Sequence, residues 1–123
     1  MNNKELIEKT INNLEDTLLY FSSQKEQSRY KNSVPFVNIP EELIAQWDSF
    51  ARLLYYQEWF VSELDKECIQ KLKEFNIHIE NFFEYCQDDC EDVPEIFENY
   101  EWINLSYHAK ELLNYIKRSN CQK

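Results

Sequence analysis

Cysteine and histidine are the residue types in this 123-residue chain that could hold a metal ion. Cys86 and Cys90 are spaced so that a helix would place both thiolates on one face, and His78 and His108 could complete a zinc site. Structural zinc usually takes its cysteines from a tight knuckle with closer spacing, and intracellular cysteines are often apolar core residues. We therefore expect neither a metal ion nor a cofactor.

Histidine also takes part in two catalytic arrangements that this sequence does not complete. A cysteine–histidine nucleophile pair needs groups that stabilise the oxyanion, and no glycine-built loop is present to supply them. A di-iron bundle needs a glutamate three residues before each histidine, but Phe75 and Leu105 precede His78 and His108. We therefore predict that the protein is not an enzyme, although scattered carboxylates can also make an acid–base site.

The acidic segment 88–99 is similar to a calcium-binding loop only in its density of carboxylates. Such a loop needs an oxygen ligand at its third position, glycine at its sixth and a bidentate acid at its twelfth. Cys90, Val93 and Asn99 occupy these three positions, so we expect no calcium site.

The absence of glycine excludes further functions and favours helices. Walker loops and dinucleotide-binding turns need backbone near phosphate that only glycine allows, and tight hairpins need glycine as well. With 43% hydrophobic and 15% aromatic residues, the chain can still bury a compact core. We predict an all-α fold, a compact bundle of about four to five helices, in a single domain spanning residues 1–123.

Apolar residues at helical spacing predict the helices of the first half. One helix runs from Asn3 to about Phe21, and a polar connection follows at about 22–39. A second helix begins at Pro40 and runs to about Phe60. Because this helix has two apolar faces, we expect it to be central and covered on both sides.

The second half is predicted to contain one long helix and two further ones. Residues 64–86 keep helical spacing after a sequence like a capping box at 62–65. A short strand at 76–79 is an alternative, but the pattern on either side stays in phase and favours the helix. After an acidic turn at 87–92, a short helix is expected through about Tyr100, and the last helix begins at Asn104 or Ser106.

The net charge of −10 lies in one third of the chain. From Glu74 to Ala109, a stretch that we call the acidic block, there are ten carboxylates and no lysine or arginine. The rest of the chain carries 13 acids and 13 bases. Nucleic acids and anionic membranes repel such a block, whereas a basic protein complements it. We therefore expect a basic protein partner, and neither direct nucleic-acid binding nor membrane binding.

Aromatic residues are interleaved with these carboxylates, and rigid aromatic side chains often anchor protein interfaces. The predicted partner-binding residues are Glu84, Tyr85, Asp88, Asp89, Glu91, Asp92, Glu95, Glu98, Tyr100, Glu101 and Trp102. The alternative is a solvated acidic face that only keeps the protein soluble.

The start of the chain contains no apolar stretch of a signal peptide, and no apolar run approaches the length of a membrane span. These observations predict a cytoplasmic protein. In that compartment the four cysteines, Cys68, Cys86, Cys90 and Cys121, are expected to be reduced thiols.

Two stretches resemble bacterial immunity proteins of contact-dependent inhibition and polymorphic-toxin systems. They are Pro40-Glu41-Glu42-Leu43-Ile44-x-x-Trp47, followed by the acidic centre, and Glu101-Trp102-Ile103-Asn104-Leu105, leading to Ala109 and Leu112-Leu113. The resemblance covers about the last two thirds of the chain. It implies a small cytosolic protein that binds one toxin domain, commonly a nuclease, and blocks its active site.

The predicted function is therefore that of an immunity protein that neutralises a basic toxin, with carboxylates standing in for the phosphates of the toxin's substrate. A phage-encoded inhibitor of a host nuclease, acting by the same mimicry of nucleic acid, is one alternative. A non-catalytic helical scaffold or regulatory subunit is another.

Overall fold

The computed structural model describes residues 2–86 and 90–123, and within them it confirms the all-α fold. This part of the chain forms six α-helices, five of them with seven residues or more, and no strand. The elements are α1 (Asn3–Ser22), α2 (Gln24–Ser33), α3 (Ile39–Tyr56), α4 (Glu58–Val61), α5 (Lys66–Cys86), the 3-10 helix η1 (Glu95–Glu98) and α6 (Tyr100–Ser119).

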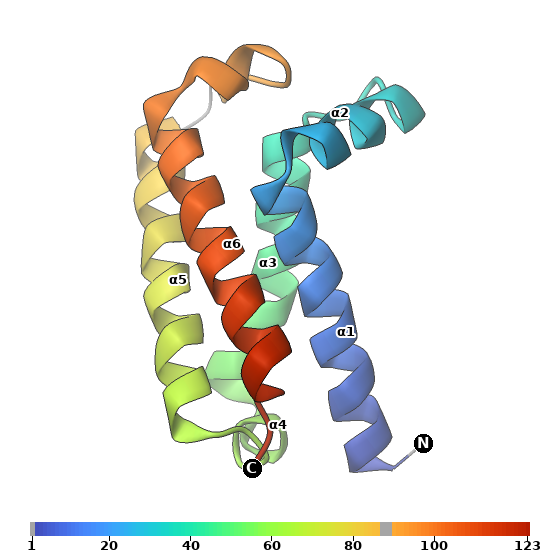
Figure 1. The fold of residues 1–123 in the computed structure, drawn as a ribbon, viewed down its shortest axis with the longest axis vertical. Helices are drawn as coiled ribbons and strands as arrows, with labels where there is room; N and C mark the ends of the chain where they lie inside the picture. The colour runs from blue at the N-terminus through green and yellow to red at the C-terminus, as the bar shows by residue number, and fades with distance from the viewer. Residues whose placement is uncertain (1, 87–89) are drawn as a thin grey trace.

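The four long helices α1, α3, α5 and α6 run along the molecule, while α2 crosses one end and α4 lies at the other (Figure 1). Helix α6 packs against both α1 and α5, and α3 packs against α1. Each of the four long helices thus packs against two of the others, since α3 also contacts α5, and α3 is no more central than its neighbours. The expectation that α3 is covered on both sides is wrong, because Tyr56, on the second apolar face that the spacing predicts with Leu53 and Phe60, is 81% exposed.

The core contains the apolar stripes that the spacing predicts. In α1 the buried residues are Ile7, Ile11, Leu14, Leu18 and Phe21, and in α5 they are Cys68, Leu72, Phe75, Ile79 and Phe82. Because α5 continues without interruption through residues 76–79, the alternative of a short strand there is wrong. Burying such a side chain stabilises the fold by roughly 1.5–3 kcal/mol.

One aromatic residue from each long helix contributes to the centre of this core. The ring of Phe75 in α5 lies 5.8 Å from that of Phe21 in α1 and 4.8 Å from that of Trp47 in α3. Trp102 in α6 completes the group, 5.8 Å from Phe21. Tilted and edge-to-face contacts between large rings fill space without glycine or close backbone approach.

The expected polar connection at 22–39 is largely helical, because one buried polar residue attaches it to the core. Gln27 in α2 is fully buried, and its amide Nε2 donates to the backbone oxygens of Tyr20 and Phe21 at 2.7 and 3.0 Å. Its Oε1 accepts the indole N–H of Trp102 at 3.2 Å. A polar sequence thus forms a helix whose single buried residue joins the end of α1 to α6.

Asparagine residues cap both ends of α6. The helix begins at Tyr100 rather than at Asn104 or Ser106, because Asn99 Oδ1 accepts the backbone N–H groups of Glu101 and Trp102 at 2.9 and 3.2 Å. At the other end Asn120 adopts a left-handed conformation with φ of 67°, a position that glycine often takes.

The cysteines differ from the expectation of reduced thiols, because the structure joins Cys68 to Cys121 and Cys86 to Cys90. Their Cα atoms are 5.4 and 4.9 Å apart, within the range that a disulfide spans. The first pair holds the C-terminal residues against the start of α5, where the Asp65 N–H donates to the carbonyl of Cys121 at 3.0 Å.

Candidate functional site

Residues 90–99, which precede α6, cross one end of the bundle, beside the last turn of α5 and the first turn of α6 (Figure 1). Seven of the predicted partner-binding residues lie there, and all seven are exposed. We call this set the acidic end; it consists of Glu84, Tyr85, Glu91, Glu95, Glu98, Tyr100 and Glu101. Asp88 and Asp89, also predicted, lie outside the described residues.

The aromatic residues predicted for this surface divide into two kinds. Tyr85 and Tyr100 are 61% and 82% exposed, as an anchor for a partner requires. Trp102 is fully buried, with its ring 5.3 Å from that of Phe82, so the expectation that it contacts a partner is wrong. Its position on the buried face of α6, one turn before Leu105, accounts for the difference.

Asp92 is also held inside the fold rather than presented to a partner. One carboxylate oxygen accepts the backbone N–H groups of Ile39 and Val93 at 3.0 and 2.7 Å, and the other pairs with Lys31 of α2. Burial by itself raises the pKa of Asp92, but the hydrogen bonds from Lys31 and the two backbone groups outweigh it and lower the pKa below its usual range. This carboxylate therefore connects α2, the start of α3 and the acidic end.

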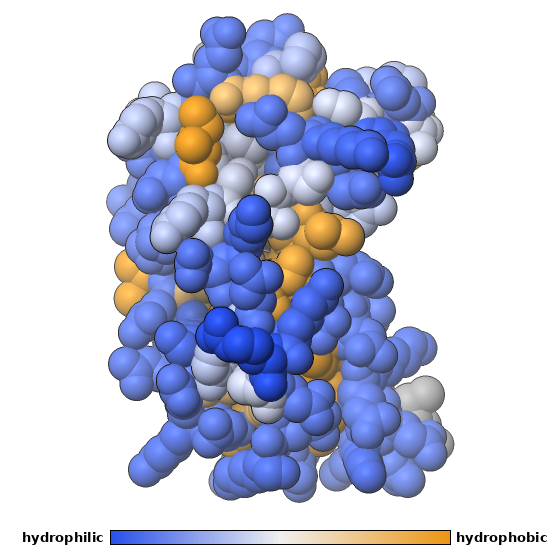
Figure 2. Space-filling view, in the orientation of Figure 1, coloured by the Kyte–Doolittle hydropathy of each residue, from blue (hydrophilic) through white to orange (hydrophobic). Residues whose placement is uncertain are grey.

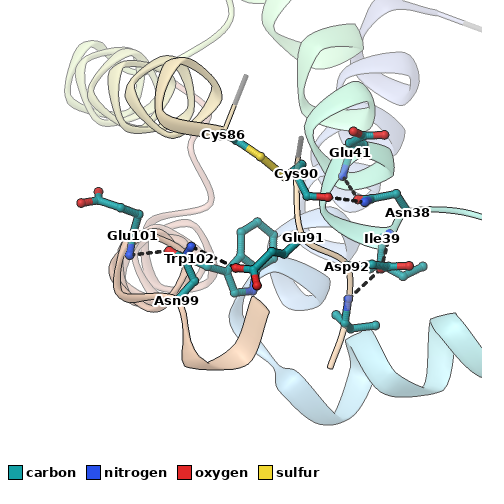
Figure 3. The surroundings of a disulfide bond; sticks show 11 residues. Asn38, Ile39, Glu41, Cys86, Cys90, Glu91, Asp92, Asn99, Glu101 and Trp102 are labelled. Carbon is teal, nitrogen blue, oxygen red and sulfur yellow. Dashed lines mark hydrogen bonds between the residues drawn. A yellow bond between two sulfur atoms is a disulfide. The ribbon is translucent and has the colours of Figure 1, made fainter. Parts of the chain in front are cut away.

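Further bonds attach the same segment to its neighbours (Figure 3). Asn38 caps α3 by accepting the Glu41 N–H at 3.0 Å, and its side-chain amide donates to the carbonyl of Cys90 at 2.9 Å. The Cys86–Cys90 bond ties the segment to the last turn of α5. The acidic end is thus fixed from two sides, which lowers the entropic cost of binding a partner.

The charges of the acidic end are not balanced within the fold. Among the described residues, none of its five glutamates forms an ion pair with lysine or arginine. Glu84 lies in the last turn of α5, which contains no basic residue and is the negative pole of the helix dipole. This arrangement disfavours the isolated protein and favours the approach of cations.

The two histidines meet between α5 and α6, where their rings stack with centroids 3.7 Å apart. They border a hollow of about 150 Å³ that Lys71, Glu74 and Glu111 also line. Burial lowers the pKa of His78, and His108 lowers it further, against an opposing effect of Glu74. Parallel stacked rings do not converge on a shared ion, and this contact joins two helices.

The four residues considered for a zinc site form two pairs instead. Cys86 and Cys90 are bonded to each other, and His78 and His108 stack on each other. The part of the chain that the structure describes brings no three His, Cys, Asp or Glu side chains into an arrangement suited to a metal ion.

The uncovered face of α3 forms a groove with α5 that was not expected from the sequence. The groove has a volume of about 830 Å³ and contains the exposed side chains of Tyr55, Tyr56, Ile77 and Phe83. Figure 2 shows a different kind of surface over α1 and α6, mostly hydrophilic, with hydrophobic residues in separate patches. The sequence carries little signal for the groove, since Tyr56 of the predicted second apolar face of α3 lines it but Leu53 and Phe60 of that face do not.

Comparisons with protein-family models, with curated proteins and with solved structures each found no match. Within residues 2–86 and 90–123, every helix is too short or too polar to span a lipid bilayer.

Proposed function

We propose that this protein is a non-catalytic immunity protein, which binds a basic toxin domain with its acidic end and thereby blocks the active site of the toxin. The observation that carries the proposal is the gathering of five exposed glutamates without ion-pair partners, among the described residues, at one end of the bundle. Two exposed tyrosines, Tyr85 and Tyr100, stand among them. A nuclease is the expected toxin activity, because a cationic groove for phosphates also attracts carboxylates.

The mechanism of inhibition would be electrostatic and steric. The negative charge speeds the encounter with a basic domain, and the tyrosines supply rigid apolar contact once the charges are close. Since the acidic end is fixed by the hydrogen bonds of Asp92 and Asn38, little order has to be gained on binding.

The proposal places this encounter in the cytoplasm, where thiols are kept reduced. The paired cysteines therefore add a requirement: the reduced protein must also bind the toxin. Asp92 and Asn38 still attach the acidic end to α2 and α3 when the Cys86–Cys90 bond is open.

The test asks whether a reading frame next to this one encodes a basic domain and then co-expresses the two proteins. The readouts are survival of the cells and inhibition of nuclease activity in vitro. The variant combines Glu91→Lys, Glu95→Lys and Glu98→Lys, all at exposed positions. We expect it to remain helical by circular dichroism, to lose protection and to associate about tenfold or more slowly.

The matched control makes the same change of charge elsewhere on the molecule. It combines Glu8→Lys, Asp16→Lys and Glu63→Lys, which are exposed and lie outside the acidic end. We expect this control to protect nearly as well as the natural sequence. Full protection by the acidic-end variant would refute the proposal.

A further inference from the structure

The groove between α3 and α5 is long enough to hold a helix. Its lining residues on α3 recur every three or four positions, from Glu41 through Ile44, Asp48 and Arg52 to Tyr55. They therefore follow one face of α3 for roughly 21 Å at 1.5 Å per residue. Recurrence at this spacing is the pattern of a helix-in-groove contact.

Large apolar side chains line this groove and remain open to solvent. Tyr55 and Tyr56 of α3 are 45% and 81% exposed, and Ile77 and Phe83 of α5 are 55% and 56% exposed. The lining also includes the small side chain of Ala45. A contiguous exposed apolar surface of this kind commonly marks a site of protein interaction.

Hydrogen bonds across the floor give the groove a fixed shape. The indole N–H of the buried Trp47 in α3 donates to Asn76 Oδ1 in α5 at 2.7 Å. The Asn76 amide in turn donates to Glu80 Oε1 at 3.1 Å. The two helices are thus linked beneath the groove, and a carboxylate is oriented at its edge.

The charge of the groove selects its occupant. Four carboxylates, those of Glu41, Asp48, Glu80 and Glu84, line it together with the single guanidinium of Arg52. That guanidinium lies 3.3 Å from Asp48, and the lining residues together carry a formal net charge of −3. One further cation, the ammonium of Lys73, lies 5.3 Å from the centre of the Tyr55 ring. A second copy of this chain would bring the same negative groove and be repelled, whereas an apolar segment flanked by lysine or arginine complements it.

We propose that the groove seats an amphipathic helix of the basic partner, with its apolar stripe on Tyr55, Ile77 and Phe83 and its cations beside the rim carboxylates. The inference rests on the proposed function and extends the contact from the acidic end along α3 and α5. Glu84 belongs to both surfaces and makes them continuous.

The test uses a fluorescein-labelled synthetic helical peptide with leucine at every third or fourth position and lysines on both flanks. A scrambled peptide of the same composition lacks the stripe. Ile77→Asp is the groove variant, and Ile103→Asp is its matched control, because Ile103 is 45% exposed on α6 outside the groove. Both variants keep the buried core residues.

We expect anisotropy titrations to show that the striped peptide binds the natural sequence and Ile103→Asp alike. Ile77→Asp should weaken its binding by about tenfold or more, and the scrambled peptide should not bind. Failure of the striped peptide to bind, or equal binding to both aspartate variants, would overturn the inference. So would sedimentation that shows a dimer which Ile77→Asp dissociates, since a second copy would then occupy the groove.

The two proposals fail in different experiments. If the acidic-end variant loses protection while Ile77→Asp keeps it in full, the groove inference is wrong and the immunity function stands. If the acidic-end variant protects in full while Ile77→Asp loses the peptide, the groove binds basic helices and the immunity function is wrong.

Discussion

Asp92 and Gln27 are polar side chains that hold the fold together. Asp92 accepts three hydrogen bonds, from Lys31 and from the backbone of Ile39 and Val93. The Gln27 amide donates to the backbone oxygens of Tyr20 and Phe21 in the last turn of α1 and accepts the indole N–H of Trp102 in α6. A buried group that loses its partners costs about 1–3 kcal/mol, so these two side chains stabilise the fold even though neither adds to the hydrophobic core.

We predict that Asp92→Asn lowers the free energy of unfolding by about 1–3 kcal/mol at neutral pH, because the ion pair with Lys31 is lost. The pKa of Asp92 is lowered from 3.8 in the folded protein, so its contribution is complete above that value and is lost as pH falls through the folded-state pKa. The difference from the natural sequence should therefore shrink in acid. Urea denaturation of both proteins at neutral pH and in acid measures this difference.

The control for this substitution is Glu95→Gln, which removes the same charge from an exposed position. It should change the free energy of unfolding by no more than about 0.5 kcal/mol. Equal stability of the two variants would mean that the contacts of Asp92 do not stabilise the fold.

At the level of the helix, apolar spacing predicts those helices that bury one regular stripe of apolar residues. The stripes of α1 and α5 predicted their buried residues, because both helices bury one face. Helix α2 has no such stripe and was missed, since a serine cap at Ser23 and the single buried Gln27 hold it. The second face of α3 differs from the prediction, because spacing places Leu53 and Tyr56 on one face but does not show whether a neighbour covers it.

Only part of the candidate site could be predicted from the sequence. Charge segregation along the chain indicated where the acids gather, and the exposed glutamates from Glu91 to Glu101 follow that pattern. The two exceptions, Asp92 and Trp102, have partners in α2 that are more than 60 residues away in sequence. Such pairings depend on tertiary structure and leave no local signal.

The two cysteine pairs join elements over very different lengths of chain, and this difference predicts their effects. Cys68 and Cys121 are 53 positions apart, whereas Cys86 and Cys90 are 4 apart. By loop entropy, replacing the first pair by alanine should lower the free energy of unfolding by about 4 kcal/mol, and replacing the second by about 2 kcal/mol. Denaturant titrations without reductant measure both changes.

The same titrations with reductant are the control, since the contribution of each bond should then disappear. A thiol assay on the unreduced, denatured protein should detect no free cysteine. Four titratable thiols would instead show that the reduced state expected of a cytoplasmic protein is the correct one.

Across the whole molecule, the helix ends differ in how well their charges suit the helix dipole. The acidic end contains five glutamates, whereas Lys117 and Arg118 lie in the last turn of α6, at the opposite end (Figure 1). The cations of α6 suit the negative pole of their helix, but Glu84 opposes that of α5. Glu101, in the first turn of α6, suits its helix dipole, so dipoles alone do not account for where the acids lie. A surface that serves a partner can instead keep an unfavourable charge.

A matched pair of substitutions, Glu84→Lys and Glu101→Lys, tests whether the acids serve the fold or a partner. Each makes the same charge reversal at the acidic end, but Glu84 lies at the negative pole of α5 and Glu101 at the positive pole of α6. We expect Glu84→Lys to raise the free energy of unfolding by about 0.3–1 kcal/mol at low salt. The free energy of unfolding of Glu101→Lys should be lower than that of Glu84→Lys. Added NaCl should reduce the difference by screening.

Both variants should nevertheless associate more slowly with the basic partner. An equal loss of stability in both would show that the acids support the fold, and a more stable Glu84→Lys that binds poorly would show that they serve the partner.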